Sequence, residues 1–200
     1  MQQNKLSINF ICRNDFRLGY LPLDQLLATS NINIKPQTQK RTLEKNGVWK
    51  LVKNMFEGNN EVLYEPSGRP FLKGDAQKYF ISISHSKNFI ALASSHKRIG
   101  IDIEEINERI LKVRPRFLNE RELEMINSTD LEYNTIAWCI KEVLFKLSKN
   151  EGLDFKIDLL ILEEIEWRKK FQCSMREGNE MKGVIVEIVR VDNLIIAFNV

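Results

Sequence analysis

Cysteine and histidine are scarce in this chain. Its 200 residues include three cysteines (Cys12, Cys139 and Cys173) and two histidines. The cysteines lie far apart and are odd in number, so neither a disulfide framework nor a redox or metal-binding pair of cysteines is predicted. Proteins with few, unpaired thiols are typical of a reducing compartment, and we expect a cytoplasmic location.

Long apolar runs and a large charge excess are also missing. No stretch approaches the roughly 18 apolar residues of a membrane span. Residues 1–23 contain Arg13, Asp15 and Arg17, which interrupt the apolar core that a signal peptide needs. Lys and Arg number 30 against 27 Asp and Glu, and the net charge of +3 lacks the strong basic excess of a nucleic-acid-binding protein. We therefore expect neither a membrane nor a nucleic acid as a partner.

Hydrophobic periodicity and turn signals predict a mixture of helices and strands. Apolar residues recur at helical spacing in three segments, and alternating or continuous apolar runs flanked by turn residues indicate two hairpins and several short strands. The predicted helices cover 38–56, 119–126 and 132–149, with a helical turn at 24–28 and a stop at Gly152; the predicted hairpins cover 79–94 and 184–199, and single strands cover 7–12, 62–64 and 99–103.

The order of these elements repeats. A helix followed by a closing hairpin is predicted in residues 1–98 and again in residues 99–200. The pattern predicts an α+β fold of two similar halves, and because no Pro-, Gly- or Ser-rich linker separates them, we expect them to pack closely together.

Charge is unevenly distributed along the chain. Between Lys35 and Lys53 six basic residues face Glu44 alone, whereas Asp102 to Glu132 holds nine acidic residues. Composition alone favours two solvated helix faces. The alternative is a protein that binds an anionic ligand together with a cation.

Two acidic side chains share one face of the strand predicted at 99–103. Asp102 and Glu104 are two positions apart, so both project to the same side, opposite Ile101 and Ile103. Neighbouring carboxylates repel each other, and a hard divalent cation such as Mg²⁺ or Mn²⁺ relieves that repulsion. The alternative is an exposed strand with charged alternation.

A polar stripe runs along the helix predicted at 132–149. Trp138, Glu142 and Lys146 are successive i, i+4 neighbours. The simple alternative is an exposed Glu–Lys pair, but an aromatic residue on the same stripe favours a pocket. Ser84 and His85, at the end of a predicted hairpin strand, suit either a phosphate contact or a solvent-exposed turn.

Together these segments resemble a known family. The stretches Ile83–Ser86, Gly100–Glu104, Phe117–Glu122 and Trp138–Lys146 occur in the order and at the intervals typical of the 4′-phosphopantetheinyl transferases. The similarity is greatest to the larger, pseudo-dimeric group that activates surfactin-type peptide synthetases. It covers roughly residues 38–160.

The resemblance implies a fold, an activity and a set of residues. The active site would lie in a cleft between the two halves, and the protein, as a monomer, would transfer 4′-phosphopantetheine from coenzyme A to a serine of an apo acyl or peptidyl carrier protein, like a holo-[acyl-carrier-protein] synthase. Mg²⁺, with Mn²⁺ as a substitute, would be held by the following carboxylates: Asp102, Glu104 and Glu142. The catalytic residues would be Glu142, Lys146 and Glu122. The coenzyme A contacts would be Arg41, Thr42, Arg69, Ser84, His85, Lys141 and Lys146.

Several questions stay open at this point. An Asp, Glu and Lys cluster with Mg²⁺ also suits a nuclease or phosphodiesterase. The restriction-type signature, however, needs an acid two residues before the lysine, where this chain has Cys139 and Leu144. The residues that bind adenine within 1–40, the carrier protein, the tolerance for acyl-coenzyme A and the choice of base between Glu142 and Glu122 are not predicted.

Overall fold

The computed structural model describes residues 7–13, 15–27, 36–150 and 152–200. The chain divides into two compact units, Met1–Arg98 and Ile99–Val200. Lys35, which begins the predicted basic segment, and Ala28, at the end of the predicted helical turn, lie outside the described residues.

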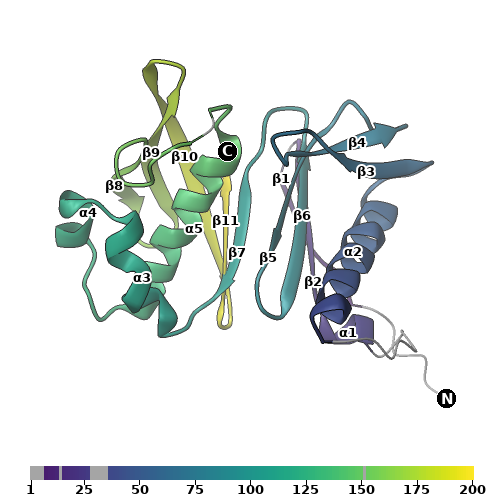
Figure 1. Ribbon diagram of the computed structural model, residues 1–200, viewed down its shortest axis with the longest axis horizontal. Coiled ribbons are helices and arrows are strands. Elements are labelled where there is room, and N and C mark those ends of the chain that lie inside the picture. Colours follow the sequence, from purple (N-terminus) through teal and green to yellow (C-terminus); the bar gives the residue numbers. More distant parts are fainter. Residues whose placement is uncertain (1–6, 14, 28–35, 151) are drawn as a thin grey trace. The chain divides into compact units, whose positions relative to one another are not determined.

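The first unit is built on a six-stranded antiparallel sheet with the order β1-β2-β6-β5-β4-β3 (Figure 1). Its strands are β1 (Asn9–Arg13), β2 (Phe16–Pro22), β3 (Asn60–Tyr64), β4 (Pro70–Gly74), β5 (Phe80–His85) and β6 (Phe89–Ser95). The short helix α1 (Asp24–Leu27) and the long helix α2 (Pro36–Met55) complete the unit.

Helix α2 packs against the sheet through the apolar positions that its sequence pattern predicts. Leu43, Leu51 and Met55 are buried in a cluster with Ile90 and Leu92 of β6. The helix buries one stripe and leaves Lys40, Arg41, Lys45 and Lys53 exposed, as an amphipathic helix on a sheet does.

The second unit contains a five-stranded antiparallel sheet with the order β7-β11-β10-β9-β8. Its strands are β7 (Ile101–Glu105), β8 (Leu159–Glu166), β9 (Lys170–Glu177), β10 (Glu180–Val191) and β11 (Leu194–Asn199). Its helices are α3 (Arg109–Phe117), α4 (Glu120–Met125) and α5 (Leu131–Leu147).

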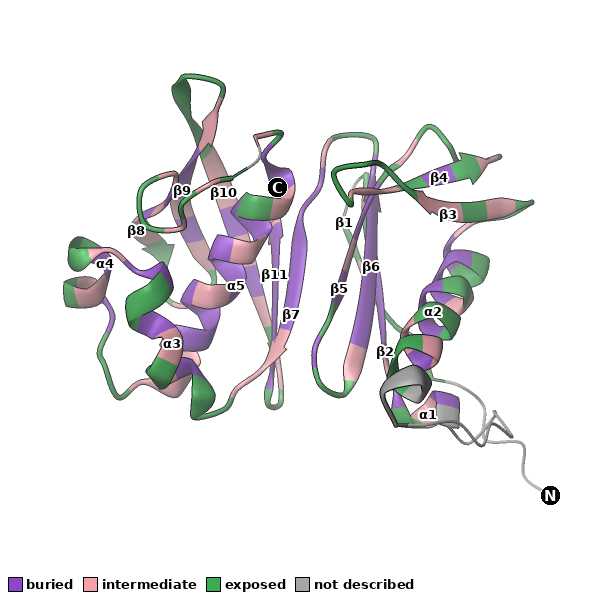
Figure 2. Cartoon of the chain, viewed as in Figure 1, coloured by how far each residue is buried: buried purple, intermediate pink, exposed green. Residues whose placement is uncertain are grey.

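Helix α5 contacts every strand of this sheet, and its buried face forms the core with Phe171, Cys173 and Ala197 (Figure 2). The Asp130 side chain accepts a hydrogen bond from the Tyr133 amide at 2.9 Å, which fixes the start of the helix. Among the described residues, no helix is long and apolar enough to cross a membrane.

The architecture confirms the mixed α and β class, with two sheets and five helices in the part of the chain that the structure describes. Both predicted hairpins are present, as β5–β6 and β10–β11. Helix α5 ends at Leu147 with Ser148 as its C-cap, so the predicted stop at Gly152 is wrong. Helix α3 and strands β2, β4, β8 and β9 were not predicted.

Candidate functional site

Glycine at position 100 lets strand β7 approach helix α5 closely. A Cβ atom at Gly100 would lie 2.5 Å from the Val143 carbonyl oxygen, which is closer than real Cβ atoms come. The Gly100 amide donates to the Asn199 side chain at 2.8 Å, so the backbone is held at this position. The close approach places the acidic side chains of β7 against the polar stripe of α5.

Asp102 and Lys146 form the centre of this contact. Asp102 is 4% exposed, and its Oδ1 accepts a hydrogen bond from Lys146 Nζ at 2.9 Å. Lys146 Nζ also donates to the Ile101 carbonyl oxygen at 2.8 Å. The exposed-strand interpretation therefore fails for Asp102, because this carboxylate is buried against the helix.

Glu104 and Glu142 lie in the same electrostatic environment. Burial raises the pKa of Glu104 to about 7, and the neighbouring charge of Asp102 contributes. Burial, followed by the same Asp102 charge, also raises the pKa of Glu142 to about 7. The two side chains therefore resist ionisation, as expected where carboxylates crowd together away from water.

Trp138 connects this environment to a row of aromatic rings. Its side chain hydrogen-bonds to Glu104, so the indole N–H donates to the carboxylate. The Trp138 ring packs edge-on against Phe117 at 5.1 Å between centroids and stacks on Phe155 at 5.9 Å. Phe155 in turn stacks on Phe145 at 5.5 Å. Sequence reasoning missed Phe155, because this residue lies in a loop without hydrophobic periodicity.

The donor set fits Mg²⁺ in its chemistry but is not gathered into a ready ligand shell. Carboxylate oxygens are the ligands that hard divalent cations prefer. Within the described ranges, however, no group of three or more His, Cys, Asp or Glu side chains is arranged to hold a metal ion. The metal-binding role of Asp102, Glu104 and Glu142 therefore stays a prediction.

Glu122 and Lys141 form a buried ion pair in the interior of the second unit. Lys141 is 0% exposed, and its Nζ lies 2.6 and 2.7 Å from the two Glu122 carboxylate oxygens. Glu122, 1% exposed, completes a capping box with Asn119 at the start of α4. Such burial favours a structural role for both residues over the predicted contact with the reacting groups and coenzyme A.

The remaining predicted residues belong to the first unit. Ser84 is buried at the end of β5, and the neighbouring His85 is exposed, with Nε2 4.0 Å from a Glu44 carboxylate oxygen on α2. Arg41 is exposed and Thr42 half-buried on the same helix. The structure thus brings the Ser84–His85 segment to α2, whereas Arg69 lies in the turn between β3 and β4.

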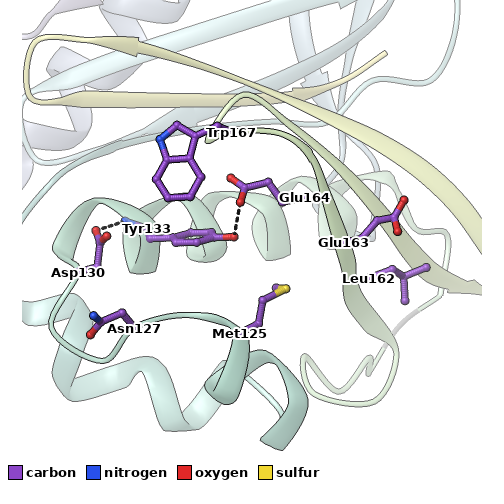
Figure 3. A pocket seen from close by; sticks show the side chains of 8 residues that line it. All are labelled: Met125, Asn127, Asp130, Tyr133, Leu162, Glu163, Glu164 and Trp167. Carbon is purple, nitrogen blue, oxygen red and sulfur yellow. Dashed lines mark hydrogen bonds between the residues drawn. The ribbon is translucent and has the colours of Figure 1, made fainter.

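A separate hollow of about 540 Å³ opens in the second unit between α4, the start of α5 and the end of β8 (Figure 3). Its lining residues are Met125, Asn127, Asp130, Tyr133, Leu162, Glu163, Glu164 and Trp167. The described side chains that line it include three carboxylates and no Lys or Arg, so its charge does not suit an anionic nucleotide.

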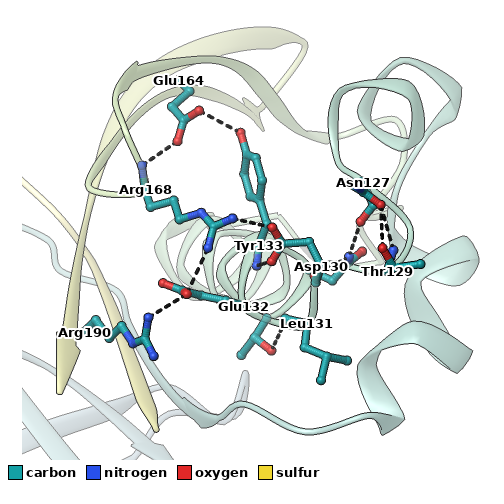
Figure 4. Close-up of polar contacts among 11 residues, drawn as sticks. Asn127, Thr129, Asp130, Leu131, Glu132, Tyr133, Glu164, Arg168 and Arg190 are labelled. Atoms are coloured by element: carbon teal, nitrogen blue, oxygen red, sulfur yellow. Dashed lines mark hydrogen bonds and ion pairs between the residues drawn. The ribbon is translucent and has the colours of Figure 1, made fainter. Parts of the chain in front are cut away.

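Arg168 lies in the turn between β8 and β9, beside this hollow, and connects the turn to the start of α5 through ion pairs (Figure 4). Its guanidinium group pairs with Asp130 and with Glu132, and lies over the Trp167 ring at 4.9 Å. Its backbone φ of 52° is unusual for a residue other than glycine, and these contacts compensate for that cost. The network explains the geometry of the turn without a ligand.

Comparison with known proteins bears on the second unit. Residues 98–188 match the model of the 4′-phosphopantetheinyl transferase superfamily. The predicted family resemblance is confirmed. The matched segment contains β7, α3, α4 and α5, and with them Asp102, Glu104, Glu142 and Lys146.

A curated relative agrees with this assignment. The chain is 31% identical over 94 residues to "4′-phosphopantetheinyl transferase gsp" from Aneurinibacillus migulanus. The alignment covers 44% of this chain and 38% of that protein, so the chain matches well under half the length of the relative. Neither comparison favours the nuclease alternative.

Proposed function

We propose that this protein transfers the 4′-phosphopantetheine group from coenzyme A to a serine of an apo acyl or peptidyl carrier protein and releases 3′,5′-ADP. The observation that carries the proposal is the Lys146–Asp102 pair beside Glu104 and Glu142, within a segment that matches the transferase superfamily. The holo-[acyl-carrier-protein] synthase subtype is part of this proposal.

In the proposed site the carboxylates of Asp102, Glu104 and Glu142 would hold Mg²⁺ or Mn²⁺. Their oxygens suit such a hard cation, and their crowding, visible in the raised pKa of Glu104 and Glu142, is what a cation would relieve. When bound, the cation supplies positive charge that stabilises the diphosphate of coenzyme A during transfer.

The chain's own residues supply the proton transfers. The carrier serine oxygen forms a bond to the phosphorus next to the pantetheine arm, and the bond from that phosphorus to the bridging oxygen of ADP breaks. We assign the serine proton to Glu142, because a carboxylate can accept it directly or through a water and this one lies on the same stripe of α5 as Lys146. Lys146 would stabilise the charge that develops on the departing ADP oxygen.

We assign the phosphates of coenzyme A to the first unit. The residues for this contact are Arg41, Thr42, Arg69, Ser84 and His85, and the exposed bases of α2 add positive charge nearby. One chain carries all of these proposed residues and would suffice as a monomer in the cytoplasm.

Intact-mass spectrometry of an apo acyl carrier protein tests this function. After incubation with the protein, coenzyme A and Mg²⁺, the carrier should gain the mass of one phosphopantetheine arm. Addition of EDTA should prevent the gain, and a second apo carrier of the peptidyl type should also be tried. If no apo carrier gains this mass while the protein is folded, the proposed function is wrong.

A further inference from the structure

The Glu122–Lys141 pair joins four segments of the second unit. Besides the two Glu122 oxygens, Lys141 Nζ donates to the carbonyl oxygens of Phe155, at 2.8 Å, and of Leu159. Glu122 also accepts from the Ile161 amide at 2.8 Å. The pair therefore ties α4 and α5 to the loop before β8 and to β8 itself, entirely out of contact with solvent.

A series of contacts leads from this pair to Glu104. Lys141 holds the main chain of Phe155, and the Phe155 ring stacks on Trp138 with an interplanar angle of 15°. The Trp138 side chain hydrogen-bonds to Glu104 on β7. A displacement of Phe155 would thus leave the Trp138 ring without its stacking partner and loosen the hydrogen bond that orients Glu104.

The energetics of the pair also indicate a role beyond stability. Removing two charges from water carries a large desolvation cost, and buried ion pairs can often be replaced by apolar residues without loss of stability. The hydrogen bonds of Lys141 Nζ and of the Glu122 carboxylate lie inside the protein, and the two side chains are 0% and 1% exposed, so neither presents a surface to a nucleotide. What remains for the pair is to fix the geometry of its neighbours.

We infer that Glu122 and Lys141 are positioning residues that set the affinity of the carboxylate site for a divalent cation, by holding Phe155 against Trp138 and thereby orienting Glu104. The inference rests on the proposed function, because the cation concerned is the one that function requires. Residues that orient metal ligands typically change metal affinity by about 10- to 100-fold when they are replaced.

The test uses Mn²⁺ as the probe, followed by electron paramagnetic resonance of the free ion. The double variant Glu122→Gln, Lys141→Met removes both charges, so that no unpaired charge is left in the core. We expect its Mn²⁺ affinity to fall by about tenfold or more. At saturating metal, the KM for coenzyme A should stay at the wild-type value.

Two further variants separate positioning from general destabilisation. Phe155→Leu breaks the ring stack and leaves the ion pair intact, so it should also weaken Mn²⁺ binding. Arg114→Met is the matched control: Arg114 is a buried cation that donates to Asn134 and to the Ile126 carbonyl oxygen, away from Phe155. It should lower thermal stability and leave Mn²⁺ affinity unchanged.

Each outcome of these measurements either supports or overturns the inference. Wild-type Mn²⁺ affinity in both the double variant and Phe155→Leu would overturn it. So would a raised KM for coenzyme A at saturating metal with unchanged Mn²⁺ affinity, because Lys141 would then contact the substrate. If the wild type transfers phosphopantetheine while these variants bind Mn²⁺ normally, only the inference fails. If the wild type neither binds Mn²⁺ nor modifies a carrier, the proposed function fails with it.

Discussion

In the proposed function, Lys146 is the residue whose charge would act on the departing ADP oxygen. From helix α5 its ammonium group reaches strand β7, where it donates to the Asp102 carboxylate and to the Ile101 carbonyl oxygen. The Lys146 side chain is 25% exposed. A cation in this position can stabilise a leaving oxygen more strongly than a ground-state diphosphate, because the charge on that oxygen grows as the bond breaks.

Replacing Lys146 by Met should lower kcat by about 100-fold and change the KM for coenzyme A by less than about threefold. Steady-state kinetics with an apo carrier protein measure both constants. Lys149→Met is the control, because Lys149 lies just after the same helix but is exposed and 3.9 Å from Glu177. Equal losses in the two variants would exclude the leaving-group role of Lys146.

The raised pKa of Glu142 predicts how the free energy of unfolding depends on pH in the absence of divalent cations. Its folded pKa of about 7 exceeds the ordinary 4.5 because the site is buried and close to Asp102. The folded state therefore favours the protonated form. The free energy of unfolding should fall as pH rises from about 4.5 to about 7, and the loss should persist above pH 7.

Glu142→Gln removes the contribution of Glu142, because the amide stays neutral, whereas the contribution of Glu104 remains. In EDTA at pH 8 the variant should be more stable than the wild type by about 1–3 kcal/mol, and near pH 4.5 the two should be equal. Urea unfolding at both pH values measures the difference, with Glu120→Gln at an exposed position of α4 as the control. Adding Mg²⁺ at pH 8 should stabilise the wild type more than the variant.

Among the elements, the contact between β7 and α5 determines the site. Asp102 and Glu104 of β7 face the helix, and the stripe of Trp138, Glu142 and Lys146 faces the strand. The distance between strand and helix is set where Gly100 meets the Val143 carbonyl oxygen.

Gly100→Ala should destabilise the protein by about 1–3 kcal/mol, because the new methyl group forces β7 away from α5. Urea unfolding measures the loss, and transferase activity should fall as well, since the acids move with the strand. Gly183→Ala in β10 is the matched control: the nearest atom to its added Cβ lies at 3.4 Å, an ordinary contact. No difference between the two variants would mean that the strand tolerates the displacement.

The two long helices, each with a clear apolar period, were predictable, whereas helix α3 and strand β9 were missed. Helix α2 follows its periodic residues, and α5 follows the stripe expected from i, i+4 spacing. Helix α3 was missed because Arg114 occupies a buried position and Pro115 lies within the helix. For β9 the signal was present, since Phe171, Cys173 and Met175 alternate with more exposed residues.

For the molecule as a whole, charge distribution matters more than the net charge of +3. The exposed bases of α2 include Lys45 and Lys53. Carrier proteins are acidic around their modified serine, so these bases would steer the partner toward the protein, and such steering weakens as salt screens the charges.

The value of kcat/KM for an apo carrier protein should therefore fall as ionic strength rises from 0.05 to about 0.5 M. Lys45→Glu should lower this value several-fold at low salt and flatten the salt dependence. Lys73→Glu, an exposed lysine on β4 of the same unit, is the control and should have a smaller effect. A salt-independent rate would show that α2 does not steer the carrier.

The sequence alone predicted the mixed α and β class, the resemblance to the 4′-phosphopantetheinyl transferases and the spacing of the candidate site residues within each element. These follow from local rules: the period of two in a strand places Asp102 beside Glu104, and the period of 3.6 in a helix aligns Glu142 with Lys146. Such rules act within one element and do not depend on what packs against it.

Only the tertiary structure decided which of these charged side chains meet. Asp102 and Lys146 are 44 positions apart and pair because Gly100 admits the helix. Glu122 and Lys141 resemble site residues by motif, yet they bond to main-chain groups in the core. The role of a charged residue depends on burial and on partners distant in sequence, and both are fixed by packing between elements.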